Sequence, residues 1–165
     1  MIKLEGIEKM SQEERLKYML VLTKGQLSSE KDDLANISNI TAIIKACIEN
    51  LNWVGFYILR GKELVLGPFQ GLPACNRIGI GNGVCGTAVG TKEIQLVSDV
   101  NKFPGHIACD SASRSELVIP IIIGKETYGV LDLDSPIKGR FTELEKKYFK
   151  DLVEILNTKI QWNNI

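Results

Sequence analysis

Apolar residues in the first third of the chain recur with the period of helices. Ser11 followed by Glu14 matches a capping box, in which each residue caps the other's backbone N–H, and this predicts a helix that runs to about Lys24. A second helix is predicted over about Asp32–Glu49, because apolar side chains there are spaced three and four residues apart and share one face. The members of that face are Leu34, Ile37, Ile40, Ile44, Cys47 and Ile48.

The chain then changes to the pattern of strands and turns. Aromatic and β-branched residues fill Trp53–Leu59, and the polar segment 60–63 leads back into Leu64–Leu66, which predicts a hairpin. Residues 67–83 contain five glycines and two prolines, so we expect a long loop there. A short helix is expected at Val84–Val89.

The last third of the chain repeats this alternation. A short strand at Ile94–Val97 and a loop over 99–114 precede a second hairpin, which pairs Leu117–Ile123 with Tyr128–Leu133. Another capping box at Thr142 opens a final amphipathic helix. Because hairpins place neighbouring strands antiparallel, the sequence predicts an α/β (α+β) fold with a central antiparallel sheet flanked by helices.

Composition limits the class of protein. The 165 residues, of which 44% are hydrophobic and 24% charged, fit one globular domain over residues 1–165 and exclude wholesale disorder. Twenty basic and twenty acidic residues cancel, which argues against a general nucleic-acid binder. No apolar run suits a membrane span, and the N-terminus lacks the pattern of a signal peptide. We therefore expect a cytoplasmic protein with no membrane or nucleic-acid partner.

Three of the four cysteines are poorly explained by packing. Cys47 lies on the apolar face of a predicted helix, where a thiol is ordinary core filler. Cys75, Cys85 and Cys109 lie in or beside the two long loops, which also hold the only histidine, His106. A Cys₃His zinc set is disfavoured, because nine and twenty-three residues separate successive cysteines and no C-x₂₋₄-C pair exists. Redox-active thiols are expected in preference to a metal site.

The sequence around two of these thiols differs in electrostatic character. Cys85 stands where the short helix begins, and backbone N–H groups at a helix start favour a thiolate. Asp110 follows Cys109 directly and disfavours a thiolate there. Any activation of Cys109 must therefore come from other parts of the fold.

Carboxylates occur at the end of an apolar strand. Asp132 and Asp134 are two residues apart, so their side chains face the same side of the strand, and Glu116 opens the strand before them. The cluster is either a solvated sheet edge or a pocket in which like charges raise a pKa. A pocket of this kind binds a cationic amine or donates a proton to an oxygen leaving group.

Two aromatic residues also share a strand face. Trp53 and Tyr57 are four residues apart on the first predicted strand. They are either part of the core or a wall that contacts a small thioether or methyl group.

Seven segments together resemble the free methionine-(R)-sulfoxide reductases, which are stand-alone GAF domains. The resemblance covers about residues 15–160, and its most specific part is the cysteine-containing stretch 103–111 together with the other two loop cysteines. The segments are Asn52–Tyr57, Leu66–Gly71, Pro73–Cys75, Gly83–Gly86, Phe103–Ser111, Ser115–Pro120 and Gly129–Ser135.

This resemblance implies a GAF-like fold with a ligand pocket under the long loops, and free methionine (R)-sulfoxide as the substrate. It implies that Cys109 is the nucleophile and that Cys75 and Cys85 serve in disulfide recycling. The substrate contacts that it implies are Trp53, Tyr57, Glu116, Asp132 and Asp134.

The residues suggest how such a reaction would run. The Cys109 thiolate attacks the sulfoxide sulfur, while Glu116 or Asp134, with a raised pKa, protonates the oxygen. The resulting sulfenic acid condenses with a second thiol, for which Cys85 is the first choice and Cys75 the second. A cytosolic reductant of the thioredoxin type then reduces the disulfide, and no bound metal, flavin or nucleotide is required.

A second class of function fits the same fold. A GAF domain without catalytic activity would bind a small ligand, or sense redox state through its thiols, and signal through a partner. By analogy with GAF domains that pair through terminal helices, a homodimer is also expected.

Overall fold

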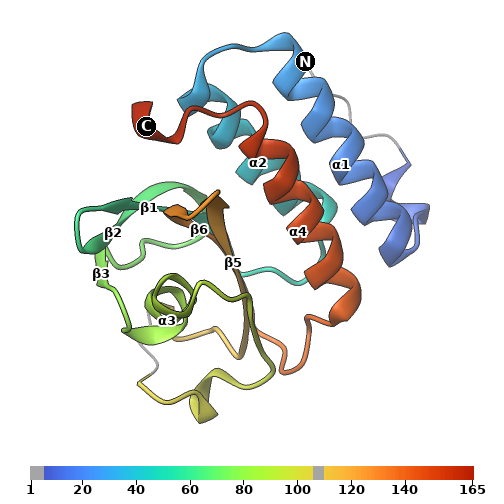
Figure 1. Cartoon of the computed structure of the whole chain (residues 1–165). Coiled ribbons are helices and arrows are strands. Elements are labelled where there is room, and N and C mark those ends of the chain that lie inside the picture. The colour runs from blue at the N-terminus through green and yellow to red at the C-terminus, as the bar shows by residue number, and fades with distance from the viewer. Residues whose placement is uncertain (1–5, 106–109) are drawn as a thin grey trace.

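A six-stranded antiparallel sheet forms the centre of the computed structural model, which describes residues 6–105 and 110–165 (Figure 1). The strand order is β3-β2-β1-β6-β5-β4, and every neighbouring pair is antiparallel. The predicted antiparallel sheet is therefore confirmed. The strands are β1 (Trp53–Arg60), β2 (Glu63–Gln70), β3 (Arg77–Gly79), β4 (Gln95–Val97), β5 (Ser115–Ile123) and β6 (Glu126–Ser135).

Helices cover both faces of the sheet. On one face lie α2 (Asp33–Cys47) and α4 (Glu143–Asn157), with α1 (Gln12–Ser29) packed against these two helices, while α3 (Gly83–Thr91) lies on the other (Figure 1). Alternation along the strands sends successive side chains to different cores. In β1, Phe56 packs under the three long helices, whereas Tyr57 packs on the α3 side. Single-turn 3₁₀ helices occur at Ile7–Lys9, Val100–Lys102 and Trp162–Asn164. In the described part of the chain, no helix combines the length and apolar character needed to cross a membrane.

The predicted helix starts are confirmed, and one predicted end and one face residue are wrong. Reciprocal capping boxes open α1 and α4. However, α1 continues past Lys24 to Ser29, because Gln26 and Leu27 are buried and this packing outweighs the poor helix propensity of Gly25. Leu34 is 55% exposed, while the other predicted members of the α2 face are buried.

The predicted loop over residues 67–83 contains strand residues at its start and again at 77–79. β2 extends to Gln70, and β3 adds a short edge strand. Gly67 permits this extension, since a Cβ there would lie 2.9 Å from the carbonyl oxygen of Phe56. Pro68 is tolerated because it falls in a bulge of the β1–β2 ladder, beyond the residues that pair with β3.

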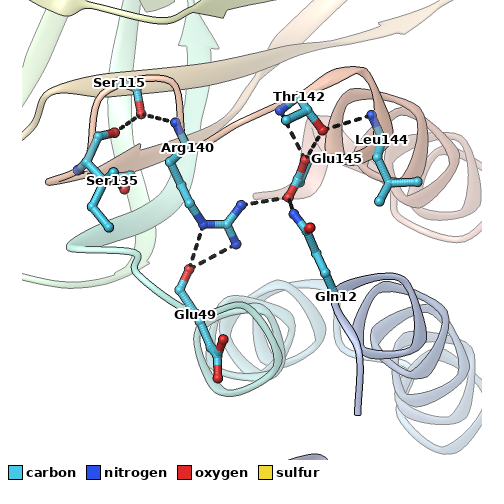
Figure 2. Close-up of polar contacts among 9 residues, drawn as sticks. Gln12, Glu49, Ser115, Ser135, Arg140, Thr142, Leu144 and Glu145 are labelled. Carbon is cyan, nitrogen blue, oxygen red and sulfur yellow. Dashed lines mark hydrogen bonds and ion pairs between the residues drawn. The ribbon is translucent and has the colours of Figure 1, made fainter.

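A buried ion pair between Arg140 and Glu145 connects the helices of this layer (Figure 2). The carboxylate of Glu145, in the first turn of α4, accepts hydrogen bonds from Gln12, Thr142 and Arg140, the last at 2.6 Å. The Arg140 guanidinium also donates to the carbonyl oxygen of Glu49 at 3.1 and 3.2 Å. The network joins the start of α4 to the start of α1 and to the segment after α2.

Candidate active site

Three carboxylates meet on the sheet face that α3 covers. Glu116 of β5 lies directly across from Asp134 of β6, and Asp132 lies two residues before Asp134 on the same side. Glu116 is 6% exposed and Asp132 is 5% exposed. The predicted cluster is therefore confirmed, and the alternative of a solvated sheet edge is wrong.

Helix α3 adds a thiol to these acids. Cys85, the third residue of α3, is buried, and its Sγ lies 3.9 Å from Oε1 of Glu116. Ligand atoms of Cys85, Glu116 and Asp132 all lie within 4.8 Å of one another. The helix forms here because Gly86 permits its backbone to approach the loop before it: a Cβ on Gly86 would lie 2.3 Å from the carbonyl oxygen of Gly79.

A small cavity opens onto this cluster. It has a volume of about 30 Å³ and is lined by Cys85, the three carboxylates, Asp110 and Ser113, among others. Oδ1 of Asp132 is buried and has no hydrogen-bond partner among the described residues. A buried carboxylate oxygen without a donor is costly, so it marks a position where a cationic or donor group would bind favourably.

An aromatic stack stands on the same face of the sheet. The ring of Trp53 stacks on Tyr57 at 5.8 Å and on Phe69 at 5.4 Å between centroids. Trp53 pairs with Asp134 across the β1–β6 ladder, so the stack adjoins the carboxylates. Gly55 leaves room for the indole, because a Cβ there would lie 2.5 Å from Trp53. The predicted sharing of a face by Trp53 and Tyr57 is confirmed.

Two features of this stack have no counterpart in the sequence patterns. Phe69 belongs to a segment that is predicted as a loop and forms a strand instead. The hydroxyl of Tyr57 donates to the carbonyl oxygen of Cys75 at 3.0 Å. The aromatic stack is thereby tied to the segment that carries one of the loop cysteines.

Burial favours the protonated form of the three acids. The pKa values of Glu116 and Asp134 are raised well above their usual range, by burial first and by the negative charge of Asp132 second. Burial raises the pKa of Asp132 to about 7. Glu145 is also buried, but hydrogen bonds from Thr142 and Arg140 outweigh its burial and lower its pKa. Glu145 has an arginine partner, whereas no lysine or arginine lies among the described residues that line the cavity of the three acids.

The prediction that the start of α3 favours a Cys85 thiolate is not supported. Burial, and then the charges of Asp132 and Glu116, raise the pKa of Cys85 well above its usual value. These effects outweigh the helix N-terminus, whose influence is of the order of 1 kcal/mol.

The other cysteines fall into different environments. Cys47 is fully buried under the helical layer, as predicted. Cys75 is disulfide-bonded, whereas Cys47 and Cys85 are free thiols. The predictions for Cys109 and His106 lie outside the described residues.

Asn52 anchors the segment that follows Cys109 in the sequence. Its Nδ2 donates to Oδ2 of Asp110 and to Oγ of Ser113, each at 2.9 Å. Asp110 also accepts from the backbone N–H of Ala112 at 2.8 Å. Because Asn52 directly precedes β1, this bond set ties the segment to the sheet, a role that no local sequence pattern indicated.

The chain is similar to known proteins over most of its length. The model of the GAF-domain family matches residues 38–160. The free methionine-R-sulfoxide reductase of Escherichia coli is 46% identical over 77% of this chain and 77% of its own length. The protein of the same name from Saccharomyces cerevisiae is 41% identical over 90% of this chain and 87% of its own.

A solved structure agrees with these relatives. The free methionine-R-sulfoxide reductase of Neisseria meningitidis, in complex with its substrate, superposes with a TM-score of 0.89 at 37% identity, over 94% of this chain and 93% of that one. A GAF sheet, a buried acidic pocket and relatives of this identity and coverage lead to one conclusion: the chain belongs to the free methionine-R-sulfoxide reductase family of GAF domains.

Proposed function

We propose that this protein reduces free methionine (R)-sulfoxide to methionine by thiol chemistry. The observation that carries the proposal is the buried acid cluster of Glu116, Asp132 and Asp134, which adjoins an aromatic stack and has no cation among the described residues that line its cavity. Two relatives at 41% and 46% identity are named for this activity. A protein that only senses redox state through its thiols would not need the acid cluster or the aromatic stack.

The charges of the site suit the ammonium group of a free amino acid. The substrate's ammonium group would neutralise part of the acid cluster and provide the donor that Oδ1 of Asp132 lacks among the described residues. Trp53 and Tyr57 would contact the methyl and thioether end, since sulfur packs well against aromatic rings. A methionine inside a peptide has no free α-amine and would lose the first of these interactions.

Reduction transfers one oxygen from the substrate to the enzyme. The Cys109 thiolate attacks the sulfoxide sulfur. Glu116 or Asp134, whose pKa values are raised well above their usual range by burial, protonates the oxygen. The hydroxyl group passes to the cysteine sulfur as the sulfur–sulfur bond breaks. Methionine leaves, reduced by two electrons, and Cys109 becomes a sulfenic acid.

Cys75 is the better candidate for the resolving thiol. It forms a disulfide in the structure, while the Cys85 thiol is buried against acids that oppose its ionisation. A thiolate is the species that attacks a sulfenic acid, so Cys85 is poorly suited to that step. The order expected from the sequence, with Cys85 first, is therefore reversed in this proposal, and Cys85 becomes part of the pocket wall. The Cys75 thiol would attack the sulfenic sulfur of Cys109, so that a sulfur–sulfur bond forms and the hydroxyl group leaves as water. A cytosolic reductant of the thioredoxin type then reduces this disulfide.

The test is turnover with separated isomers. Reduced protein is mixed with the (R) or the (S) isomer of free methionine sulfoxide and a thioredoxin recycling system, and the methionine formed is measured. Many turnovers confined to the (R) isomer are expected, and Cys109→Ser should abolish them. Folded, reduced protein that turns over neither isomer would overturn the proposal and favour a GAF sensor.

A further inference from the structure

We propose that Cys85, Glu116 and Asp132 form a binding site for a thiophilic divalent cation of the zinc class, which excludes the substrate's ammonium group. The argument for ion binding uses only the described residues. The argument for competition between ion and substrate also rests on the proposed function.

The donor atoms have the spacing of a metal site. Sγ of Cys85 lies 3.9 Å from a Glu116 oxygen, and one atom from each of the three residues lies within 4.8 Å of the others. With Zn–S near 2.3 Å and Zn–O near 2.0 Å, two ligand atoms of a tetrahedral zinc ion are about 3.5 Å apart. Small side-chain adjustments therefore bring all three donors into contact with one ion.

The type of donor selects the class of ion. Magnesium and calcium prefer sites made of oxygen atoms only, whereas a thiolate favours zinc and similar ions. Three protein ligands leave a fourth position open, as in zinc sites that exchange water or ligand. When the ion binds, the Cys85 thiol, the Glu116 carboxyl group and any protonated Asp132 release their protons to solvent, and the metal–sulfur and metal–oxygen bonds form.

A second observation points to a ligand at this place. Asp132 is only 5% exposed, lines the cavity, and leaves Oδ1 without a partner among the described residues. The cavity of about 30 Å³ has room for a single ion with a water molecule. No basic side chain from the described residues lines it, so the described part of the protein does not itself neutralise these acids.

The three ligands come from separate, rigid elements. Cys85 is on α3, Glu116 on β5 and Asp132 on β6, and β5 and β6 are paired along their whole length. The set is distinct from a Cys₃His site, since it uses neither His106 nor the two other loop cysteines. Sequence spacing does not reveal it, because the three residues are far apart along the chain.

Competition follows from shared oxygens. The carboxylates that would receive the substrate's ammonium group are those that would bind the ion. An ion bound to them blocks the substrate, and substrate displaces the ion. The chain would then be inhibited reversibly by free zinc-class ions.

The test uses the full chain with Cys75→Ser and Cys109→Ser, in which Cys47 and Cys85 are the remaining thiols. This double variant is freed of metal by a chelator, and Co²⁺ is titrated in as an optical probe. We expect one Co²⁺ per chain with a thiolate-to-cobalt charge-transfer band, and displacement of Co²⁺ by Zn²⁺. Adding Cys85→Ser should remove the band and weaken Zn²⁺ binding by at least about 100-fold.

Two further variants guard against misfolding and misassignment. Glu116→Gln keeps the side-chain shape and should weaken Zn²⁺ binding by at least about 10-fold. Cys47→Ala, on the opposite face of the sheet, should leave the band and the affinity unchanged. A band that survives Cys85→Ser, or the absence of a band in protein shown to be folded, overturns the inference.

Free methionine (R)-sulfoxide is then added to the cobalt-loaded double variant. Because this variant cannot turn over, the sulfoxide acts only as a ligand, and it should raise the apparent Kd for Co²⁺. An unchanged Kd overturns the competition. Wild-type turnover without ion binding would overturn the metal site alone, whereas ion binding without wild-type turnover would support the metal site and overturn the proposed reductase function.

Discussion

The Cys85 thiol and the Glu116 carboxyl group face each other 3.9 Å apart, across the interface between α3 and the sheet. Thirty-one positions separate them in the sequence, so their meeting is a product of the tertiary fold. Burial beside Asp132 opposes the ionisation of both groups. Groups that favour their protonated form in this way can donate a proton to the oxygen of a substrate.

Glu116→Gln should reduce the activity without reducing the stability of the fold. The amide keeps the shape of the side chain but cannot donate an acidic proton or attract an ammonium group. We expect kcat/KM for free methionine (R)-sulfoxide to fall by about 10²- to 10⁴-fold. The protein should be no less stable, because a buried acid without a basic partner among the described residues is removed. The exposed Glu126→Gln on β6 is the matched control, and a Glu116→Gln enzyme with the parent rate would contradict the assignment.

The acid cluster should also make the protein less stable as pH rises. An unfolded aspartate ionises near its usual pKa of 3.8, whereas Asp132 in the folded protein holds its proton up to about pH 7. The folded state therefore binds more protons in this window, and the contribution of Asp132 to the unfolding free energy declines from about pH 4 to about pH 7. The slope is at most about 1.4 kcal/mol per pH unit for this group.

Urea denaturation between pH 5 and pH 7.5, in the presence of a chelator, measures this effect. The midpoint should fall with pH in the parent protein and fall less in Asp132→Asn. Equal pH dependence in the two proteins would show that Asp132 is not responsible.

Gly55→Ala should disturb the aromatic stack. The added Cβ would lie 2.5 Å from both Trp53 and the Cβ of Phe69, closer than real contacts allow. Overpacking of this kind costs about 1–3 kcal/mol, and a displaced indole should raise the KM. Gly25→Ala in α1 is the control, since nothing lies within 4 Å of its Cβ position and the helix should gain stability. Thermal denaturation and steady-state kinetics would decide, and an unchanged KM in Gly55→Ala would argue against Trp53 as a substrate contact.

Asn52→Ala should act on turnover through the segment after Cys109. The change removes the hydrogen bonds to Asp110 and Ser113, each worth about 1 kcal/mol. If these bonds position the nucleophile, kcat should fall by about 10-fold or more while the KM changes little. Asn52→Asp should not restore the rate, because its carboxylate would face that of Asp110. A loss of thermal stability with normal kcat would assign Asn52 a structural role only.

Local sequence patterns determined much of this molecule. Capping boxes placed the starts of α1 and α4, and the period of two along β6 put Asp132 and Asp134 on one face. These features were predictable because they depend on neighbours within a few residues. The family was indicated by the identity of residues in seven segments, of which the cysteine-containing ones are the most specific.

The remaining features depend on contacts between segments that are far apart in the sequence. They include the extension of β2 through Gly67 and Pro68 and the exposure of Leu34. They also include the hydrogen bond from Asn52 to Asp110. Most of all, the tertiary structure reversed the expected ionisation of Cys85. A helix start favours a thiolate locally, but burial against carboxylates from two distant strands dominates, because desolvation and charge act through space and not along the chain.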